Sequence, residues 1–180
     1  MRNGRRYGPD ARAHLADPAR QQRLRDAKQI YDPMVRGKLV HRAVQLTAFR
    51  GDWSYNGIRA VAAEVEPEGL PPIYKMSIRT VLVTAVGSYR NNFRRANWKL
   101  VGYEIAAGPL WLDLLWRTPD GLVADELKMG EGYAAGAPAE DLAQVRGQCT
   151  HAARTWGDEF LGVRLLPLLT PDQQRWVAAQ

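Results

Sequence analysis

The sequence has no long apolar run and almost no cysteine, and both absences exclude classes of protein. No stretch is apolar over the length that a bilayer-crossing helix needs. The basic residues 1–6 are not followed by the apolar region of a secretory signal. Cys149 is the single cysteine, which excludes an internal disulfide and a zinc cluster made of several cysteines. We therefore expect a cytoplasmic protein with no membrane partner.

Composition and charge fit a single globular domain with a polyanionic partner. Of 180 residues, 46% are hydrophobic and 24% are charged, which is ordinary for a folded chain. Two independent domains would each be small for a separate core. The net charge of +6 favours nucleic acid as a partner, because each Lys or Arg near a phosphate releases a counterion. Many basic proteins bind no nucleic acid, so charge alone does not settle the function.

The first 76 residues predict a helical extension packed on a core. Asp–Pro pairs at 17–18 and 32–33 mark two helix starts, since Asp caps the helix and Pro fits its first position. The first helix would end near residue 30, and apolar positions at helical spacing continue the second to residue 46. Glycines and prolines interrupt residues 51–75, where only a short helix at 58–66 is expected.

Residues 77–180 predict an α/β core, with a central mixed sheet flanked by helices. A Pro-Asp-Gly turn at 118–121 joins two strands into a hairpin, and the last strand is apolar enough to be central. A short helical tail is expected from Pro171. The predicted order is helix, strand, strand, strand, helix, strand, over residues 77–97 (capped by Ser77), 98–106, 110–117, 122–129, 139–156 and 160–169.

Two carboxylates and an amine are predicted to share one patch on the hairpin. Glu126 and Lys128 point to the same side of their strand, because side chains alternate along a strand. Asp113 lies on the other arm, and the turn brings it beside Glu126. A divalent metal held by both carboxylates would remove their repulsion, and oxygen ligands suit Mg²⁺ or Mn²⁺. Lys128 could then activate a water or neutralise charge on a phosphate.

This pattern resembles the PD-(D/E)XK nuclease superfamily. The shared features are an acidic residue in the second strand, Glu-x-Lys in the third, and the order αβββαβ. The resemblance implies a restriction-endonuclease-like fold and Mg²⁺-dependent hydrolysis of DNA phosphodiester bonds. It also implies that the middle residue of Glu-x-Lys, here Leu127, lends its backbone carbonyl to the metal.

Two further motifs resemble the RecB-like exonuclease branch. Residues Gly37 to His41 match its Gly-x-x-x-His helix motif, which implies that His41 is a further metal ligand. Gln144 matches the Gln of its Gln-x-x-x-Tyr motif, which implies a contact with the substrate or with the lysine. Gln148 stands where the branch has Tyr. Nucleases of this branch often carry a helicase, so a helicase or another partner protein is also expected.

Several residues carry a structural interpretation beside the functional one. Glu126 and Lys128 could form a solvated strand edge, and His41 could be an ordinary core or surface histidine. Glu104 could approach the metal or pair with an arginine. Asp125 points to the opposite face and is expected to pair with an arginine or a helix N-terminus. Cys149 and His151 are expected to be structural, and Trp53 or Trp156 could stack a base.

A basic cluster precedes the first strand. Its side chains could contact phosphates near the active edge of the sheet, or they could be a solvated helix end; they are Arg90, Arg94, Arg95 and Lys99.

The sequence leaves several functions open. The expected activity is that of a metal-dependent deoxyribonuclease. One alternative is a catalytically silent nuclease fold that binds nucleic acid or serves in assembly. Another is a toxin or defence nuclease that acts on RNA or on invading DNA. Cutting from ends or internally, the shape of the substrate, the pathway and the oligomeric state are likewise open.

Overall fold

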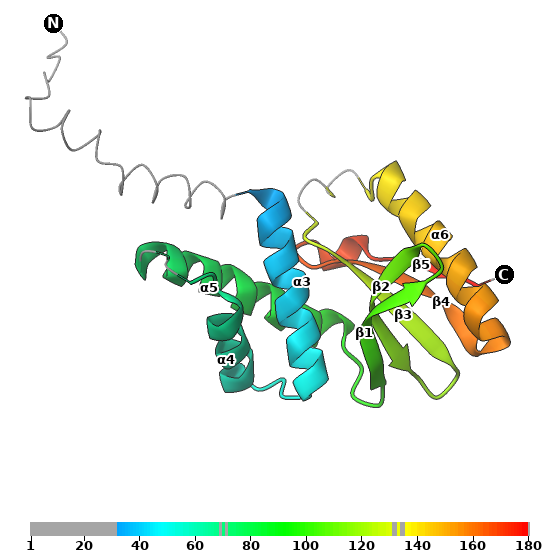
Figure 1. Cartoon of the computed structure of the whole chain (residues 1–180), viewed down its shortest axis with the longest axis horizontal. Coiled ribbons are helices and arrows are strands. Elements are labelled where there is room, and N and C mark those ends of the chain that lie inside the picture. The colour runs from blue at the N-terminus through cyan, green and yellow to red at the C-terminus, as the bar shows by residue number, and fades with distance from the viewer. Residues whose placement is uncertain (1–31, 69, 71, 131–132, 134–135, 180) are drawn as a thin grey trace, which may run out of the picture.

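The computed structural model describes residues 32–68, 70, 72–130, 133 and 136–179. The helix predicted at 17–30 lies outside the described residues. Within them, the chain is an α/β protein in which helices flank a mixed sheet (Figure 1).

Three helices form the first half of the described chain: α3 (Pro33–Arg50), α4 (Tyr55–Val65) and α5 (Pro72–Ser88). Asp32 caps α3 by accepting a hydrogen bond from the amide of Met34 at 2.8 Å, which confirms the helix start predicted at the Asp–Pro pair. Gly51 ends α3 in the left-handed conformation, where a residue without a Cβ is favoured.

Helix α5 differs from the prediction at both ends. It begins at Pro72, so Ser77 is not its cap, and the predicted boundary between residues 76 and 77 falls inside it. At its other end it passes into a π-helical turn, η1 (Tyr89–Phe93), closed by the bond from the Arg94 amide to the Tyr89 carbonyl. Both aromatic side chains of this turn are buried. The wider π turn therefore coincides with the burial of these two rings, which are four residues apart. Apolar spacing alone does not predict such a turn.

Five strands form one sheet in the order β1-β2-β3-β4-β5. Strands β3 and β4 are parallel and the other neighbours are antiparallel. Helix α6 (Ala139–Trp156) makes the crossover between the parallel pair and begins and ends as predicted. The strands are β1 (Lys99–Ala107), β2 (Leu110–Arg117), β3 (Leu122–Lys128), β4 (Phe160–Pro167) and β5 (Arg175–Ala178), with short 3-10 turns η3 (Gly157–Glu159) and η4 (Pro171–Gln173) around β4.

Strand β5 corrects the prediction of a helical tail. After η4 the chain pairs antiparallel with β4 over four residues. Without β5, β4 would be an edge strand with unpaired backbone groups, so the tail completes a ladder. The pairing gives β4 the internal place that its apolar sequence predicted.

The two faces of the sheet bury separate apolar clusters. Leu114, Trp116 and Leu127 pack toward α3, α4 and α5. Leu115 and Ala124 pack toward α6. Strand β3 therefore lies between two cores, and its polar residues are held between them. Among the described residues, no helix is both long and apolar enough to span a membrane.

Candidate functional site

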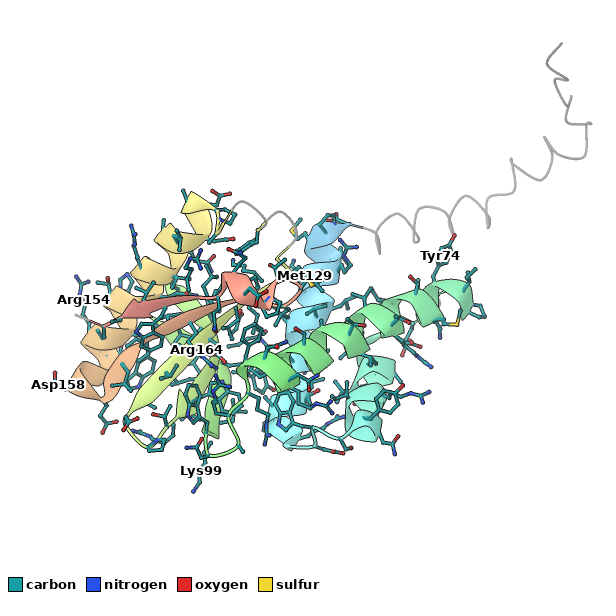
Figure 2. All side chains as sticks on the ribbon, turned by 180° about the vertical axis from the view of Figure 1, so that it is seen from behind. Tyr74, Lys99, Met129, Arg154, Asp158 and Arg164 are labelled. Carbon is teal, nitrogen blue, oxygen red and sulfur yellow. The ribbon has the colours of Figure 1, made fainter. Side chains whose placement is uncertain are left out.

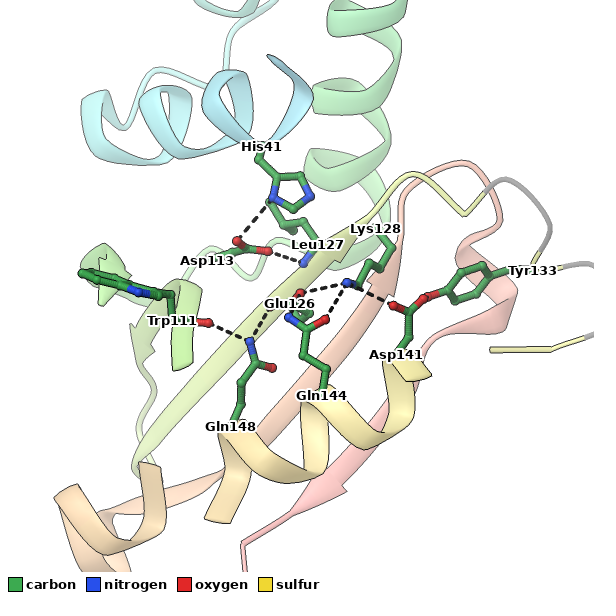
Figure 3. Close-up of polar contacts among 10 residues, drawn as sticks. All are labelled: His41, Trp111, Asp113, Glu126, Leu127, Lys128, Tyr133, Asp141, Gln144 and Gln148. Atoms are coloured by element: carbon green, nitrogen blue, oxygen red, sulfur yellow. Dashed lines mark hydrogen bonds and ion pairs between the residues drawn. The ribbon is translucent and has the colours of Figure 1, made fainter. Parts of the chain in front are cut away.

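The candidate site lies where strands β2 and β3 separate. Their pairing runs from Arg117–Leu122 to Leu114–Asp125 and goes no further. Beyond that point side chains replace the ladder: the Leu127 amide donates to Asp113 Oδ2 at 2.7 Å, and Gln148 Nε2 donates to the Trp111 carbonyl at 2.7 Å. The separation leaves room between the strands for polar side chains, and the acidic residue of each arm lies there (Figure 3).

Glu126 is the most enclosed member of the site, with 3% of its surface exposed. Its Oε1 accepts from Gln144 Nε2 at 2.8 Å and lies 3.1 Å from Lys128 Nζ. Its Oε2 accepts from Gln148 Nε2 at 2.6 Å. Gln144 and Gln148 are one turn apart on α6, so both amides reach the same carboxylate. Gln148, which stands at the Tyr position of the Gln-x-x-x-Tyr motif, is thus a member of the site.

Lys128 is held by three acceptors. Its Nζ donates to Gln144 Oε1 at 2.9 Å and lies 3.1 Å from both Glu126 Oε1 and Asp141 Oδ1. The Tyr133 hydroxyl donates to the other oxygen of Asp141, which fixes that carboxylate in place. Asp141 and Tyr133 are not among the residues predicted from the sequence. The signal that could have found Asp141 is its position three residues before Gln144, on the same face of α6.

His41 reaches the site from the helical half. Its Nδ1 lies 3.3 Å from Asp113 Oδ1, and the imidazole is partly exposed. The predicted residues Asp113, Glu126, Lys128 and Gln144 are therefore brought together with His41, from β2, β3, α6 and α3 (Figure 3). Gly37 has open space around its Cα, so no packing requirement explains the glycine of the Gly-x-x-x-His motif.

Negative charge outweighs positive charge in the site. Burial, and then the charge of Asp113, raises the pKa of Glu126. Burial lowers the pKa of Lys128, but Glu126 and Asp141 outweigh it and the pKa is raised. The same balance raises the pKa of His41, where Asp113 outweighs burial. Three carboxylates thus share one ammonium and one imidazole.

The donor set fits a hard cation, although the described residues hold no preassembled metal site. No group of three His, Cys, Asp or Glu side chains within them is placed to bind a metal ion as it stands. The excess of negative charge still favours a cation beside Glu126, because burial and the charge of Asp113 both raise the pKa of this carboxylate. Carboxylate and amide oxygens are the ligands that Mg²⁺ accepts.

The predicted basic cluster lies away from this site, which corrects the expected position near the active edge. In the register of β1 and β2, Lys99 lies across from Arg117, at the end of the strands away from the site. Figure 2 shows Lys99 well apart from Met129, the residue after Lys128. Arg90 donates to the Trp53 carbonyl at 3.2 Å, and Arg94 lies over the Trp53 ring. Arg95 is exposed beside them. Because a helix is followed by β1, these residues lie at the start of β1. In the antiparallel register of β1 and β2, that start lies away from Asp113.

Asp125 has the structural role that was expected of it. Arg164 donates to both of its oxygens, at 2.7 and 2.8 Å. The Tyr89 hydroxyl and the Trp116 indole donate to Oδ2, at 2.6 and 3.0 Å. Four donors satisfy this buried carboxylate on the face away from Glu126.

The remaining candidates do not enter the network. Glu104 is exposed, has a φ of 48° and forms no ion pair with a described arginine. Trp53 is buried against Tyr89 with ring centroids 5.5 Å apart, and Trp156 packs on Phe160 at 5.8 Å. The two indole rings that were expected to stack on a base each have one face in contact with another aromatic ring. His151 and Cys149, which were expected to be structural, pack on Gly108 and inside the core respectively.

Comparison of the chain with known protein families, with curated proteins and with solved structures found no match.

Proposed function

We propose that this protein is a metal-dependent nuclease that hydrolyses DNA phosphodiester bonds, with a restriction-endonuclease-like αβββαβ core of the PD-(D/E)XK type. One observation carries the proposal: Asp113, Glu126 and Lys128 meet at the opening between β2 and β3 with an excess of negative charge. A cation would relieve that excess, and a phosphate bound to the cation would lie beside the ammonium group.

Asp113, Glu126, His41 and the backbone carbonyl of Leu127 would hold Mg²⁺ or Mn²⁺. When bound, such an ion supplies a Lewis acid and lowers the pKa of a water that attacks phosphorus. The hydrogen bond from the Leu127 amide to Asp113 supports this choice, because it brings the backbone of Leu127 next to that carboxylate. Gln148 orients Glu126 from α6 and also fixes the Trp111 carbonyl, so the same side chain holds both arms of the opening.

Lys128 would orient the attacking water and neutralise charge that develops on the phosphate. Gln144 contributes by accepting from Lys128 and donating to Glu126, which keeps the two side chains at a fixed separation. Asp141 draws the ammonium from the other side. A preoriented charge of this kind stabilises a transition state without reorganisation during the reaction.

DNA is the proposed substrate because the chain is basic overall and Lys128 would lie beside a phosphate bound to the cation. The net charge of +6 favours a polyanion even though the site itself is acidic.

The direct test is conversion of supercoiled plasmid to nicked or linear DNA in Mg²⁺ and in EDTA. We expect cleavage by the wild-type protein in Mg²⁺ alone. Lys128→Ala should lose roughly 10²-fold or more in rate while it keeps its fold, since it removes one preoriented charge. Lys75→Ala, which removes an ammonium from α5, is the matched control and should cleave normally. No cleavage by the wild-type protein, or full activity in Lys128→Ala, would contradict the proposal.

End-labelled linear, circular and branched DNA compared side by side would define the mode of cutting. An exonuclease releases nucleotides from the linear form and leaves the closed circle intact, as the likeness to the exonuclease branch predicts. Cutting of the circle would instead assign an endonuclease with the same chemistry.

A further inference from the structure

Trp111 is a large apolar side chain exposed beside the candidate site. Its indole is 62% exposed, whereas Trp116, five residues later on the same strand, is 4% exposed. Other large apolar side chains of the described residues are equally exposed, and what sets Trp111 apart is an aromatic face next to the candidate site. Trp111 comes two residues before Asp113, or about 7 Å along an extended strand.

The backbone that carries this indole is held in place on α6. Gln148 donates to the Trp111 carbonyl at 2.7 Å and to Glu126 at 2.6 Å, so one side chain ties the tryptophan to the candidate site. Leu110 packs directly over the Cα of Gly147, and the turn at Gly108 lies against the ring of His151. A side chain on a fixed backbone loses little freedom on binding, which favours its use as a recognition element.

The indole itself points away from this anchor. Leu112, the next residue, belongs to the core on the α6 side, so alternation directs Trp111 to the other side of β2. Figure 3 shows the ring directed away from the Glu126 carboxylate and from Gln148, while the carbonyl of the same residue is turned toward them. The face of the ring is thus free for a planar ligand.

We propose that Trp111 is a stacking site for the base of an unpaired nucleotide that adjoins the phosphate held at Asp113 and Glu126; the position of that phosphate rests on the proposed function. A base inside a duplex is covered on both faces by its neighbours, so the indole can stack only on a single strand or on the last base at an end. The ligand class is therefore a nucleobase with a free face, in any sequence, because every base has a π-face.

The test is binding of a short fluorescent single-stranded DNA with Ca²⁺ in place of Mg²⁺, measured by anisotropy. Trp111→Ala should weaken binding roughly tenfold or more, and Trp111→Phe, which keeps an aromatic face, should retain most of the affinity. Trp176→Ala is the matched control, because Trp176 is 50% exposed on β5 at the opposite edge of the sheet. A strand with abasic sugars should bind the wild-type protein and Trp111→Ala equally.

Several outcomes would overturn the stacking site. These are absence of single-strand binding by the wild-type protein, equal binding by Trp111→Ala, or a loss that persists on the abasic strand. Unchanged DNA binding would leave the indole as a contact for a protein partner. Because binding in Ca²⁺ requires no cleavage, a protein that binds through Trp111 but never cuts DNA would contradict only the nuclease proposal. One that cuts DNA without dependence on Trp111 would contradict only the stacking site.

Discussion

Two adjacent carboxylates of β3, Asp125 and Glu126, are buried to nearly the same extent and have opposite surroundings. Asp125 is 0% exposed and contacts Tyr89 and Trp116, whereas Glu126 is 3% exposed and contacts two glutamines of α6. Asp125 has a buried partner of opposite charge, Arg164, which donates two hydrogen bonds. Glu126 shares the one ammonium of its site, Lys128, with a second carboxylate.

The difference shows that charge balance, rather than burial, separates a structural acid from a candidate ligand. Burial lowers the pKa of Arg164, but the charge of Asp125 outweighs burial and the pKa is raised. The Tyr89 hydroxyl beside them has its pKa raised by burial and then by the charge of Asp125. Glu126 has its own pKa raised by burial and by Asp113. The first carboxylate is already neutralised by the protein, and the second still favours a cation.

The largest effect should come from breaking the balanced pair. Asp125→Asn leaves the Arg164 charge buried without its partner, and removal of one member of a buried pair costs about 3–5 kcal/mol. Urea unfolding monitored by circular dichroism measures this loss. The milder variant Tyr89→Phe removes one hydrogen bond to the carboxylate and should cost about 1.5–3 kcal/mol. Unfolding midpoints equal to that of the wild-type protein would show that the pair is not structural.

For Glu126, the next residue, we expect a loss of activity with little loss of stability. Glu126→Gln should abolish DNA cleavage while the free energy of unfolding changes by no more than about 1 kcal/mol, because a neutral amide relieves the unfavourable charge but gives up hydrogen bonds. Cleavage and urea unfolding of the same preparation provide both readings. A variant as unstable as Asp125→Asn would show that Glu126 is structural too.

A variant of Gln148 tests whether its hydrogen bond to Glu126 is needed for activity. Gln148→Ala removes the donor to Glu126 Oε2 and to the Trp111 carbonyl, and loss of such a supporting contact typically costs 10- to 100-fold in metal affinity or activity. The rate of plasmid cleavage in Mg²⁺ measures it, with Gln173→Ala on η4 as the matched control. Equal rates for the two variants would remove Gln148 from the site.

The smallest effect concerns a carboxylate whose partners are more exposed. Arg79 donates to Glu66, and this contact, with Lys75 at 3.5 Å, lowers the pKa of Glu66 against the effect of burial. A lowered pKa means that the stabilisation is present above the usual pKa of Glu and is lost as the pH falls through the lowered value. Glu66→Gln should therefore cost up to about 1 kcal/mol at neutral pH and little in acid. Urea unfolding at both pH values checks it, and a cost independent of pH would contradict the assignment.

The parts of the fold that the sequence predicted are those fixed by local chemistry. The cap at Asp32, the hairpin turn and the limits of α6 follow from residues close in the chain. Strand β5 was missed because its four residues are extended only by pairing with β4. The π turn at Tyr89 reflects contacts with distant residues, Trp53 and Asp125, which no local pattern contains.

The candidate site likewise contains residues that could be predicted from the sequence and residues that could not. Asp113, Glu126, Lys128 and Gln144 could be predicted, because strand alternation and the hairpin bring three of them together and the fourth follows from a motif. Asp141 could have been added from its position three residues before Gln144 on α6. Tyr133 could not, since its contact is with Asp141, eight residues later, and no local pattern indicates it. The basic residues around Lys99 were misplaced because position along the chain does not specify which end of the hairpin is occupied by the site.

A calorimetric titration of Mg²⁺ measures whether the unbalanced carboxylates bind a cation. The comparison needs three proteins: wild type, Glu126→Gln, and Glu159→Gln, which removes an exposed carboxylate that pairs with Arg117. We expect binding by the wild-type protein and by Glu159→Gln, and none by Glu126→Gln. Equal binding by all three, or no binding by the wild-type protein, would contradict this expectation.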